Sequence, residues 1–426
     1  MDKISKYKTF CIIPYTRLHS LNNCDYRACC HTEPGLPNAD GKPANMFKDK
    51  FEEVWNNNYF RQLRLDMVNG VQNKTCAVCW KMESQDEYSF REKYNLDHTE
   101  EELEYFFNET LEKNGLTDTI PRSIQIKIGN LCNLKCIMCN QASSILIQEE
   151  IIKWQKKEEI IPKWLDWVEG HEIDWTGLTP ENFEIFYSMM RPGLIATKQI
   201  QIVGGEPLVN HATTMLMERL IDEGVAHNIG IYIISNLTTL PPKIIKLFSH
   251  FNYATISVSW DHVDPEKFRF IRFPARYDHF KKNIDTLHFK TTIEPKISCT
   301  LNIFNIYDLE SIFDEFEKTR KGRSHYTVNI QFVENPNYFS IRYLETEQKE
   351  EIIKLVEQYL EKSKDYLIWK DLPATYNQLS TIKEQLVSTV DNFKEVVKER
   401  TRVLKMYDKE RDTDYKSLFP YIKDYE

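Results

Sequence analysis

The middle of this chain alternates short β-branched runs with longer amphipathic runs, and this alternation limits its fold most strongly. Six runs rich in isoleucine, valine and threonine predict strands, at 123–129, 197–204, 228–235, 253–260, 294–302 and 327–333. Helical patterns lie between several of them, at 212–224, 241–250, 275–288 and 309–320. Such alternation is typical of βα units around a parallel sheet. Six strands favour an open, partial (β/α)6 TIM-type barrel over a closed one, with its active site at the C-terminal strand ends.

Regions of different amino-acid composition and pattern flank this α/β core. Residues 1–115 carry six cysteines, turn-rich stretches, and helical patterns at 51–70 and 101–115. Residues 336–426 are charged and helical in pattern, which indicates helices with one solvated face. We therefore expect an N-terminal cysteine-rich domain, a barrel over residues 116–335, and a C-terminal helical extension.

Charge and hydropathy exclude some classes of protein. The formal net charge of −9 makes a general nucleic-acid coat unlikely. No stretch approaches the roughly 20 apolar residues that a membrane-spanning helix needs. The start of the chain has no apolar core of signal-peptide length, so we expect a cytoplasmic protein.

Cysteines dominate the functional signal, because nine of the ten lie in the first third of the chain in tight groups. Without a secretion signal, grouped cysteines favour metal binding over disulfides. Cys132, Cys136 and Cys139 form a CxxxCxxC pattern directly after the first predicted strand of the barrel. Three thiolates can hold three irons of a [4Fe–4S] cluster and leave the fourth iron open. A structural zinc site normally takes four protein ligands, although CxxxCxxC alone is also compatible with a zinc loop.

A second motif follows the second predicted strand of the barrel, where Gly204 and Gly205 precede Glu206. Glycines let backbone approach a ligand closely, and the carboxylate can accept from an ammonium group. Together with CxxxCxxC, this motif resembles the radical S-adenosylmethionine (SAM) superfamily. The resemblance implies that SAM chelates the open iron and that the GGE motif receives its amine. It also implies reductive cleavage of SAM to a 5′-deoxyadenosyl radical that abstracts hydrogen from a substrate, with a flavodoxin or ferredoxin as electron donor.

The resemblance implies further contacts to SAM. Asn236, in the sequence IISNLT, matches the polar element near the ribose, and Arg272 matches an arginine that binds the carboxylate. A surface salt bridge is the alternative role for Arg272. Met138 takes the place of a frequent aromatic near the adenine, and a thioether can also pack on a base. His262 replaces the usual glycine after the acid of the fourth strand.

The N-terminal cysteines provide a second possible site. A CxxC pair and two upstream cysteines give four thiolates, which both zinc and iron–sulfur clusters accept. This region resembles the twitch or SPASM accessory domains of radical SAM enzymes, which implies one auxiliary [4Fe–4S] cluster and two clusters in all. A β-hairpin across the 17-residue gap between Cys11 and Cys29 predicts the ligand set Cys11, Cys29, Cys76 and Cys79. Cys30 is the alternative to Cys29, because adjacent strand residues point opposite ways.

The substrate is open at this point. Accessory domains of this kind occur in enzymes that act on ribosomally made peptides and on aminocyclitols or sugars. We favour peptide or protein modification or oxidation through the auxiliary cluster, with dehydrogenation of a small polyol or amino sugar as the alternative. A non-catalytic iron–sulfur or zinc redox sensor is the alternative of another class. No catalytic acid or base can be assigned, and His31, His262 and Glu334 are candidates that also have structural explanations.

A tryptophan-rich run at 154–175 has two interpretations. Its tryptophans either form a lid or substrate wall over the barrel mouth, or pack as a hydrophobic insertion against the barrel. The four residues are Trp154, Trp164, Trp167 and Trp175.

Overall fold

The computed structural model divides into two compact units, each built from several chain segments. The first unit comprises Met1–Asn130, Asp174–Tyr232 and Lys246–Tyr253, and the second comprises Leu131–Ile173, Ile233–Ile245 and Ala254–Glu426. The structure describes residues 8–32, 35–84, 88–157, 161–162, 165, 174–291, 293–320, 327–366, 368 and 381–425.

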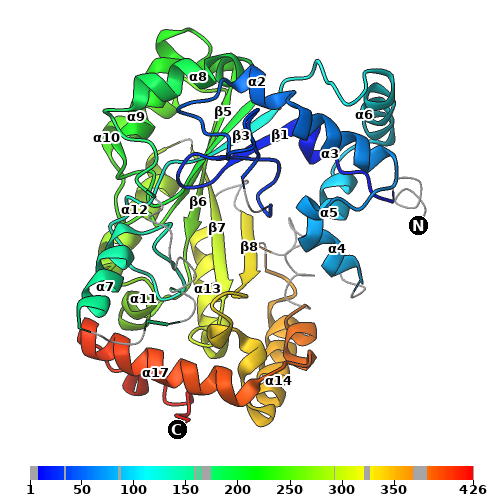
Figure 1. Cartoon of the computed structure of the whole chain (residues 1–426). Coiled ribbons are helices and arrows are strands. Elements are labelled where there is room, and N and C mark those ends of the chain that lie inside the picture. Colours follow the sequence, from blue (N-terminus) through cyan, green and yellow to red (C-terminus); the bar gives the residue numbers. More distant parts are fainter. Residues whose placement is uncertain are drawn as a thin grey trace. The chain divides into compact units, whose positions relative to one another are not determined.

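An eight-stranded sheet runs in the order β2-β1-β3-β4-β5-β6-β7-β8 (Figure 1). Its strands are β1 (Arg17–Ser20), β2 (Tyr26–Arg27), β3 (Ser123–Lys127), β4 (Gln199–Val203), β5 (Gly230–Ser235), β6 (Tyr253–Ser259), β7 (Glu294–Leu301) and β8 (Thr327–Phe332). The last six coincide with the six predicted strands, so the mixed α/β fold with a partial TIM-type barrel is confirmed. The sheet is mostly parallel, and the described pairing of β1 with β2 is antiparallel.

The N-terminal region adds strands to the barrel sheet, which the sequence pattern did not predict. β1 pairs in parallel with β3, where Leu18 lies opposite Ile124. Both side chains are buried, so the contact extends the apolar core of the sheet. β3 in turn pairs in parallel with β4, with Ile126 opposite Ile202.

Four helices of the first unit begin at a residue whose side chain caps the helix, namely α3 (Asn58–Val68), α5 (Phe90–Leu96), α6 (Glu100–Glu112) and α9 (His211–Asp222). The predicted helix at 51–70 is broken in two because the Asn57 side chain accepts from the Phe60 amide and starts a new helix. Thr99 and Glu102 form a capping box at the start of another. Further helices of this unit are α1 (Ile13–Thr16), α2 (Phe51–Trp55), α4 (Ala77–Ser84) and α8 (Phe183–Ala196).

The second unit holds the later barrel strands and the C-terminal helices. Phe419 packs edge-on against Phe270 and Phe304, with ring centroids 5.3 and 5.0 Å apart, so the end of the chain belongs to the core of this unit. The helices are α7 (Ile145–Lys156), α11 (Pro265–Ile271), α12 (Tyr277–Lys290), α13 (Leu309–Arg320), α14 (Thr346–Ser363), α17 (Phe393–Arg411) and α18 (Tyr415–Leu418). α10 (Pro242–Phe248) has residues in both units.

Trp154 on α7 is fully buried, and its ring centroid lies 6.2 Å from that of Tyr407 on α17. It is therefore a packing residue. Trp175 is buried in the first unit, whereas Trp164 and Trp167 lie outside the described residues.

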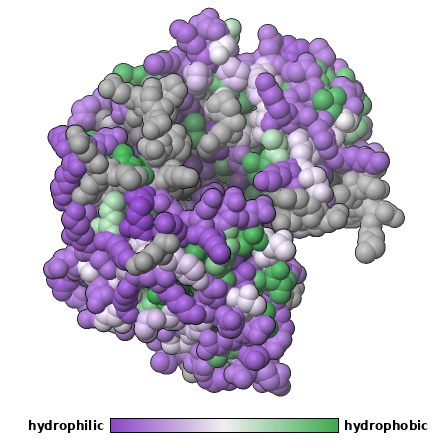
Figure 2. All heavy atoms as spheres, turned by 60° about the horizontal axis from the view of Figure 1, so that its bottom comes forward, coloured by the Kyte–Doolittle hydropathy of each residue, from purple (hydrophilic) through white to green (hydrophobic). Residues whose placement is uncertain are grey.

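Hydrophilic residues predominate on the face of the molecule shown in Figure 2, and hydrophobic residues are scattered among them. In the part of the chain that the structure describes, we find no helix with the length and apolar character needed to cross a bilayer.

Candidate functional site

The CxxxCxxC cysteines lie on an irregular loop after β3, and neighbouring backbone fixes this loop. The Lys135 amide donates to the Phe273 carbonyl at 2.7 Å, and the Ile137 amide donates to the Ile271 carbonyl at 3.0 Å. The Ser144 hydroxyl also donates to the Leu134 carbonyl at 2.6 Å. These three bonds hold the loop between its cysteines, so the thiols project from a constrained backbone. We call residues 131–140 the cysteine loop.

Hydrogen-bond donors approach the sulfur atoms of the cysteine loop. Asn236 Nδ2 lies 4.0 Å from Cys132 Sγ, and Arg272 Nη1 lies 4.0 Å from Cys136 Sγ. The Leu134 amide donates to Cys132 Sγ at 3.4 Å. Donors directed at cysteine sulfurs favour the thiolate form and tune the potential of iron–sulfur clusters. The loop therefore fits three thiolate ligands of a [4Fe–4S] cluster.

Burial favours the protonated form of two thiols of this loop, those of Cys136 and Cys139. It raises the pKa of Cys139 to about 12, with a further increase from the neighbouring Cys136 thiol. Burial also raises the pKa of Cys136, and the Arg272 guanidinium partly opposes that increase. Because only thiolates bind iron, ligation must release these protons.

A buried ion pair sets the position of Arg272. Its Nη2 lies 2.6 Å from Asp261 Oδ2, and the Asp261 side chain is fully buried. Asp261 Oδ1 accepts from the Thr300 amide at 2.8 Å, which anchors the carboxylate to β7. Arg272 thus presents one nitrogen to Asp261 and another to Cys136, so it does form a salt bridge, but a buried one and not one at the surface.

The GGE motif follows β4 in the first unit, where glycines pack closely. Gly204 has a φ of +126°, and the Gly205 amide donates to the Gly129 carbonyl at 2.7 Å. A Cβ atom on Gly204 would lie 2.9 Å from backbone atoms of Ile128 and Gly129. Glu206 is buried and accepts from the Leu208 amide at 3.0 Å. This tight backbone turn places a carboxylate at the end of β4.

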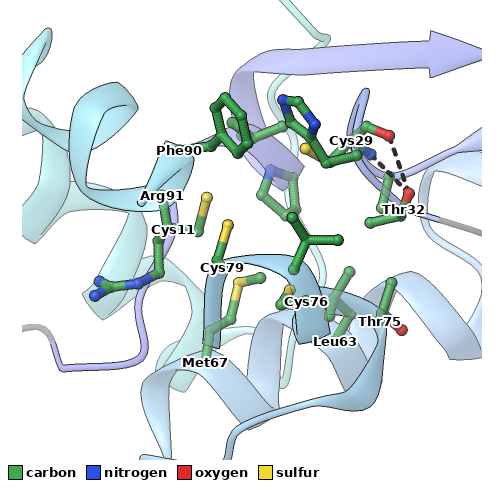
Figure 3. Close-up of a pocket in the computed structure, with 15 residues that line it drawn as sticks. Cys11, Cys29, Thr32, Leu63, Met67, Thr75, Cys76, Cys79, Phe90 and Arg91 are labelled. Carbon is green, nitrogen blue, oxygen red and sulfur yellow. Dashed lines mark hydrogen bonds between the residues drawn. The ribbon is translucent and has the colours of Figure 1, made fainter. Parts of the chain in front are cut away.

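The four predicted N-terminal cysteines line one cavity in the first unit (Figure 3). Its empty volume is about 460 Å³, part of which opens to solvent. The predicted hairpin is confirmed, because β1 and β2 pair with His19 opposite Arg27. Cys11 precedes α1 and Cys29 follows β2, while Cys76 lies directly before α4 and Cys79 lies in the first turn of α4. Apolar side chains complete much of the lining, including Ile13, Leu63, Met67, Val78 and Phe90.

These four cysteines lie within electrostatic range of one another. The Cys11 thiol interacts with those of Cys76 and Cys79, and it also interacts with that of Cys29. Burial raises the pKa of Cys76 to about 12 and raises that of Cys11 further. Four thiols around an apolar cavity fit four thiolate ligands, a set that both zinc and a [4Fe–4S] cluster accept. Within the described ranges, no three His, Cys, Asp or Glu side chains converge on the position of a single metal ion.

Residues 126–318 match the Radical SAM superfamily. These residues form a radical SAM domain. No curated protein matches the chain.

The chain is also similar to solved structures. Identity is 17% to native anSMEcpe with bound AdoMet, over 57% of this chain and 62% of that chain, with a TM-score of 0.40. Identity is 14% to Streptococcus suis SuiB bound to precursor peptide SuiA, over 72% of this chain and 63% of that chain, with a TM-score of 0.39. The matches thus span somewhat less than two thirds of both structures.

Within the radical SAM domain, the structure gathers some of the predicted SAM-binding residues at the cysteine loop. Asn236 and Arg272 approach its sulfurs, and Met138 lies half-buried in the turn between Cys136 and Cys139. Their contacts to SAM stay predictions, as does the role of the GGE motif.

The candidate acids and bases differ in their surroundings. His262 is buried, with Nε2 3.1 Å from Asp308 Oδ2 and Nδ1 accepting from the Asp264 amide, which suits a structural role. Glu334 is exposed. His31 lines the N-terminal cavity and stacks on Phe90 with ring centroids 3.5 Å apart.

Sequence reasoning missed two glycines that allow close backbone packing at the end of β3. Gly129, with a φ of +113°, has no room for a side chain, since its Cβ would lie 2.1 Å from the Thr176 carbonyl oxygen. A glycine at the end of the first predicted strand, just before the cysteine loop, is the signal that could have found it. Gly177 packs against Gly129 in a segment where no motif was evident.

We expect Gly204→Ala to weaken SAM binding at least tenfold and to lower the free energy of unfolding by about 1–3 kcal/mol, because its φ and its neighbours both oppose a Cβ. Isothermal titration with SAM and denaturant unfolding measure the two effects. Gly224→Ala is the matched control: its φ is +72°, but nothing lies within 4 Å of the added Cβ. Wild-type SAM affinity in Gly204→Ala would contradict the prediction.

Proposed function

We propose that this chain is a radical SAM enzyme that modifies or oxidises a peptide or protein, with one cluster on the cysteine loop and an auxiliary cluster in the N-terminal cavity. The observation that carries the proposal is a CxxxCxxC loop whose sulfurs receive donors from Asn236 and Arg272. When bound, a reduced [4Fe–4S] cluster with SAM supplies one-electron cleavage of SAM and a hydrogen-abstracting radical.

Residues of this chain would bind the cluster and limit the access of water to it. Cys132, Cys136 and Cys139 would supply the three thiolates, and Asp261 keeps Arg272 directed at the loop. The cysteines are half-buried, which limits access of water to the loop. Glu206, buried after β4, is the proposed acceptor for the amine of SAM.

The proposal of an oxidation rests on the N-terminal cysteines, whereas the preference for a peptide follows from the resemblance of this region to twitch or SPASM domains. Four thiolates would leave no open iron in a [4Fe–4S] cluster, which suits a cluster that accepts an electron from a substrate radical. Removing the abstracted hydrogen atom, a proton and this electron gives a net two-electron oxidation of the substrate. A flavodoxin or ferredoxin would supply the electron that initiates each turnover.

The decisive test measures 5′-deoxyadenosine and methionine formed from SAM by reconstituted, reduced protein under anaerobic conditions. We expect Cys132→Ala to reduce their formation at least about 1,000-fold, because the loop loses one of three cluster ligands. Cys24→Ala is the control, since its buried thiol lies outside both proposed ligand sets. Undiminished cleavage in Cys132→Ala would place the catalytic cluster elsewhere.

Mass spectrometry of candidate substrates then separates the substrate classes. Loss of two hydrogens or a new cross-link in a peptide supports the proposal, whereas oxidation of a polyol or amino sugar alone would replace it. Wild-type protein that binds a cluster but never cleaves SAM would favour a redox sensor.

A further inference from the structure

A buried carboxylate links α17, in the C-terminal extension, to the cysteine loop. Glu150 lies on α7, and its two carboxylate oxygens pair with different cations. Oε1 lies 2.6 Å from Lys135 Nζ, and Oε2 lies 2.7 Å from Arg411 Nη2. Lys135 belongs to the cysteine loop, and Arg411 is the last residue of α17. The side chains of Glu150 and Arg411 are 3% and 2% exposed, so this link is shielded from solvent screening.

The ring of Phe273 reinforces the same link. Lys135 Nζ lies 5.5 Å from its centroid and Arg411 Cζ lies 5.6 Å from it, so both cations contact one aromatic ring. Phe273 also accepts from the Lys135 amide through its carbonyl. The backbone and side chain of Lys135 are therefore both fixed, one residue before Cys136.

α17 also lies near the cysteines themselves. The Arg411 guanidinium acts electrostatically on the Cys136 thiol, and Tyr407 interacts with Cys139. Arg411 stacks on Tyr407 with Cζ 3.9 Å from the ring centroid, which orients both side chains. Removing Arg411 would take one of two cationic partners seen among the described residues away from the buried Glu150 carboxylate, and an undercompensated buried charge is costly. We expect Glu150 and Lys135 to shift, and the cysteine loop with them.

We infer that Arg411 is a positioning residue, through which α17 holds the cysteine loop in the geometry that accepts the cluster. This inference rests on the proposed function of the loop. It makes the C-terminal extension part of the cluster site, although the extension contributes no ligand.

The test compares Arg411→Gln with Glu410→Gln in the full-length, reconstituted protein. Glu410 also joins α17 to α7, through ion pairs with Lys153 and Lys157, but these pairs do not involve the cysteine loop. The readout is the electron paramagnetic resonance (EPR) signal of the reduced cluster that changes on addition of SAM, followed as a chelator removes iron. This signal reports only a cluster to which SAM binds.

We expect Arg411→Gln to broaden or shift this signal and to speed its loss to the chelator about 10-fold to 100-fold, as for other residues that orient metal ligands. Glu410→Gln is expected to match the wild type, and Arg411→Lys to recover part of the effect. If Arg411→Gln does not fold, Lys135→Gln breaks the same link at its more exposed end and is expected to show the same change.

Two results would overturn the inference. One is a signal and a rate of signal loss equal to those of the wild type in Arg411→Gln or, if that variant does not fold, in Lys135→Gln. The other is an equal change in Glu410→Gln, which would assign the effect to general helix packing. In both cases the wild type still shows the SAM-responsive signal, so the proposed function stands. A wild-type protein that takes up no cluster would overturn the proposed function together with the inference.

Discussion

Replacing Cys132, Cys136 and Cys139 together by alanine is expected to lower the iron content of anaerobically prepared protein from about eight atoms per chain to about four. The three thiols lie on one loop, and none of them forms a disulfide. The N-terminal cavity has its own four cysteines, which share no residue with this loop. The two sites should therefore lose their clusters independently.

Iron, sulfide and zinc per chain are the quantities to measure, together with the EPR spectrum of the reduced protein. Cys299→Ala is a control, because this fully buried thiol on β7 is outside both proposed ligand sets. A fall from about four irons to none with one zinc retained would make the N-terminal site a structural zinc site. Unchanged iron in the triple variant would contradict the assignment of the loop, and no iron in the wild type would refute the enzyme hypothesis.

Local patterns explain how much of this fold could be predicted. Each barrel strand is a short β-branched run, and the CxxxCxxC and GGE motifs lie a few residues beyond two strand ends. Such signals need no knowledge of distant residues. The hairpin that contains β1 was predicted, but its addition to the barrel sheet was not, because a four-residue strand with the sequence RLHS carries no periodic signal. Its place in the sheet depends on pairing with β3, which is about a hundred residues away in the chain.

In the candidate site, too, contacts between residues far apart in the chain could not be predicted from local sequence patterns. Arg272 could be selected through a resemblance, but its buried partner Asp261 could not, because an acid after a strand has many other uses. The link from Glu150 to Arg411 joins residues 261 positions apart, and the charged pattern of the C-terminal region indicated only helices with a solvated face. Buried ion pairs of this kind are specified by tertiary packing, so a single sequence does not reveal them.

Removal of a ligand from the N-terminal cavity is expected to have the second large effect. In Cys29→Ala, iron should fall from about eight atoms per chain to about four, while cleavage of SAM stays within about threefold of the wild type. The cavity and the cysteine loop share no ligand, so the loop cluster should survive. Cys76→Ala is expected to behave in the same way, and to abolish turnover of the substrate once it is identified.

The adjacent cysteine provides a control for this prediction. Cys29 lines the cavity, whereas Cys30 interacts with His19 and Tyr94 as well as with Cys29. We therefore expect Cys30→Ala to retain about eight irons. Iron loss in Cys30→Ala but not in Cys29→Ala would exchange their roles. Loss of SAM cleavage in both Cys29→Ala and Cys76→Ala would instead give the N-terminal site a role in folding, because the loop cluster would then depend on a site with which it shares no ligand.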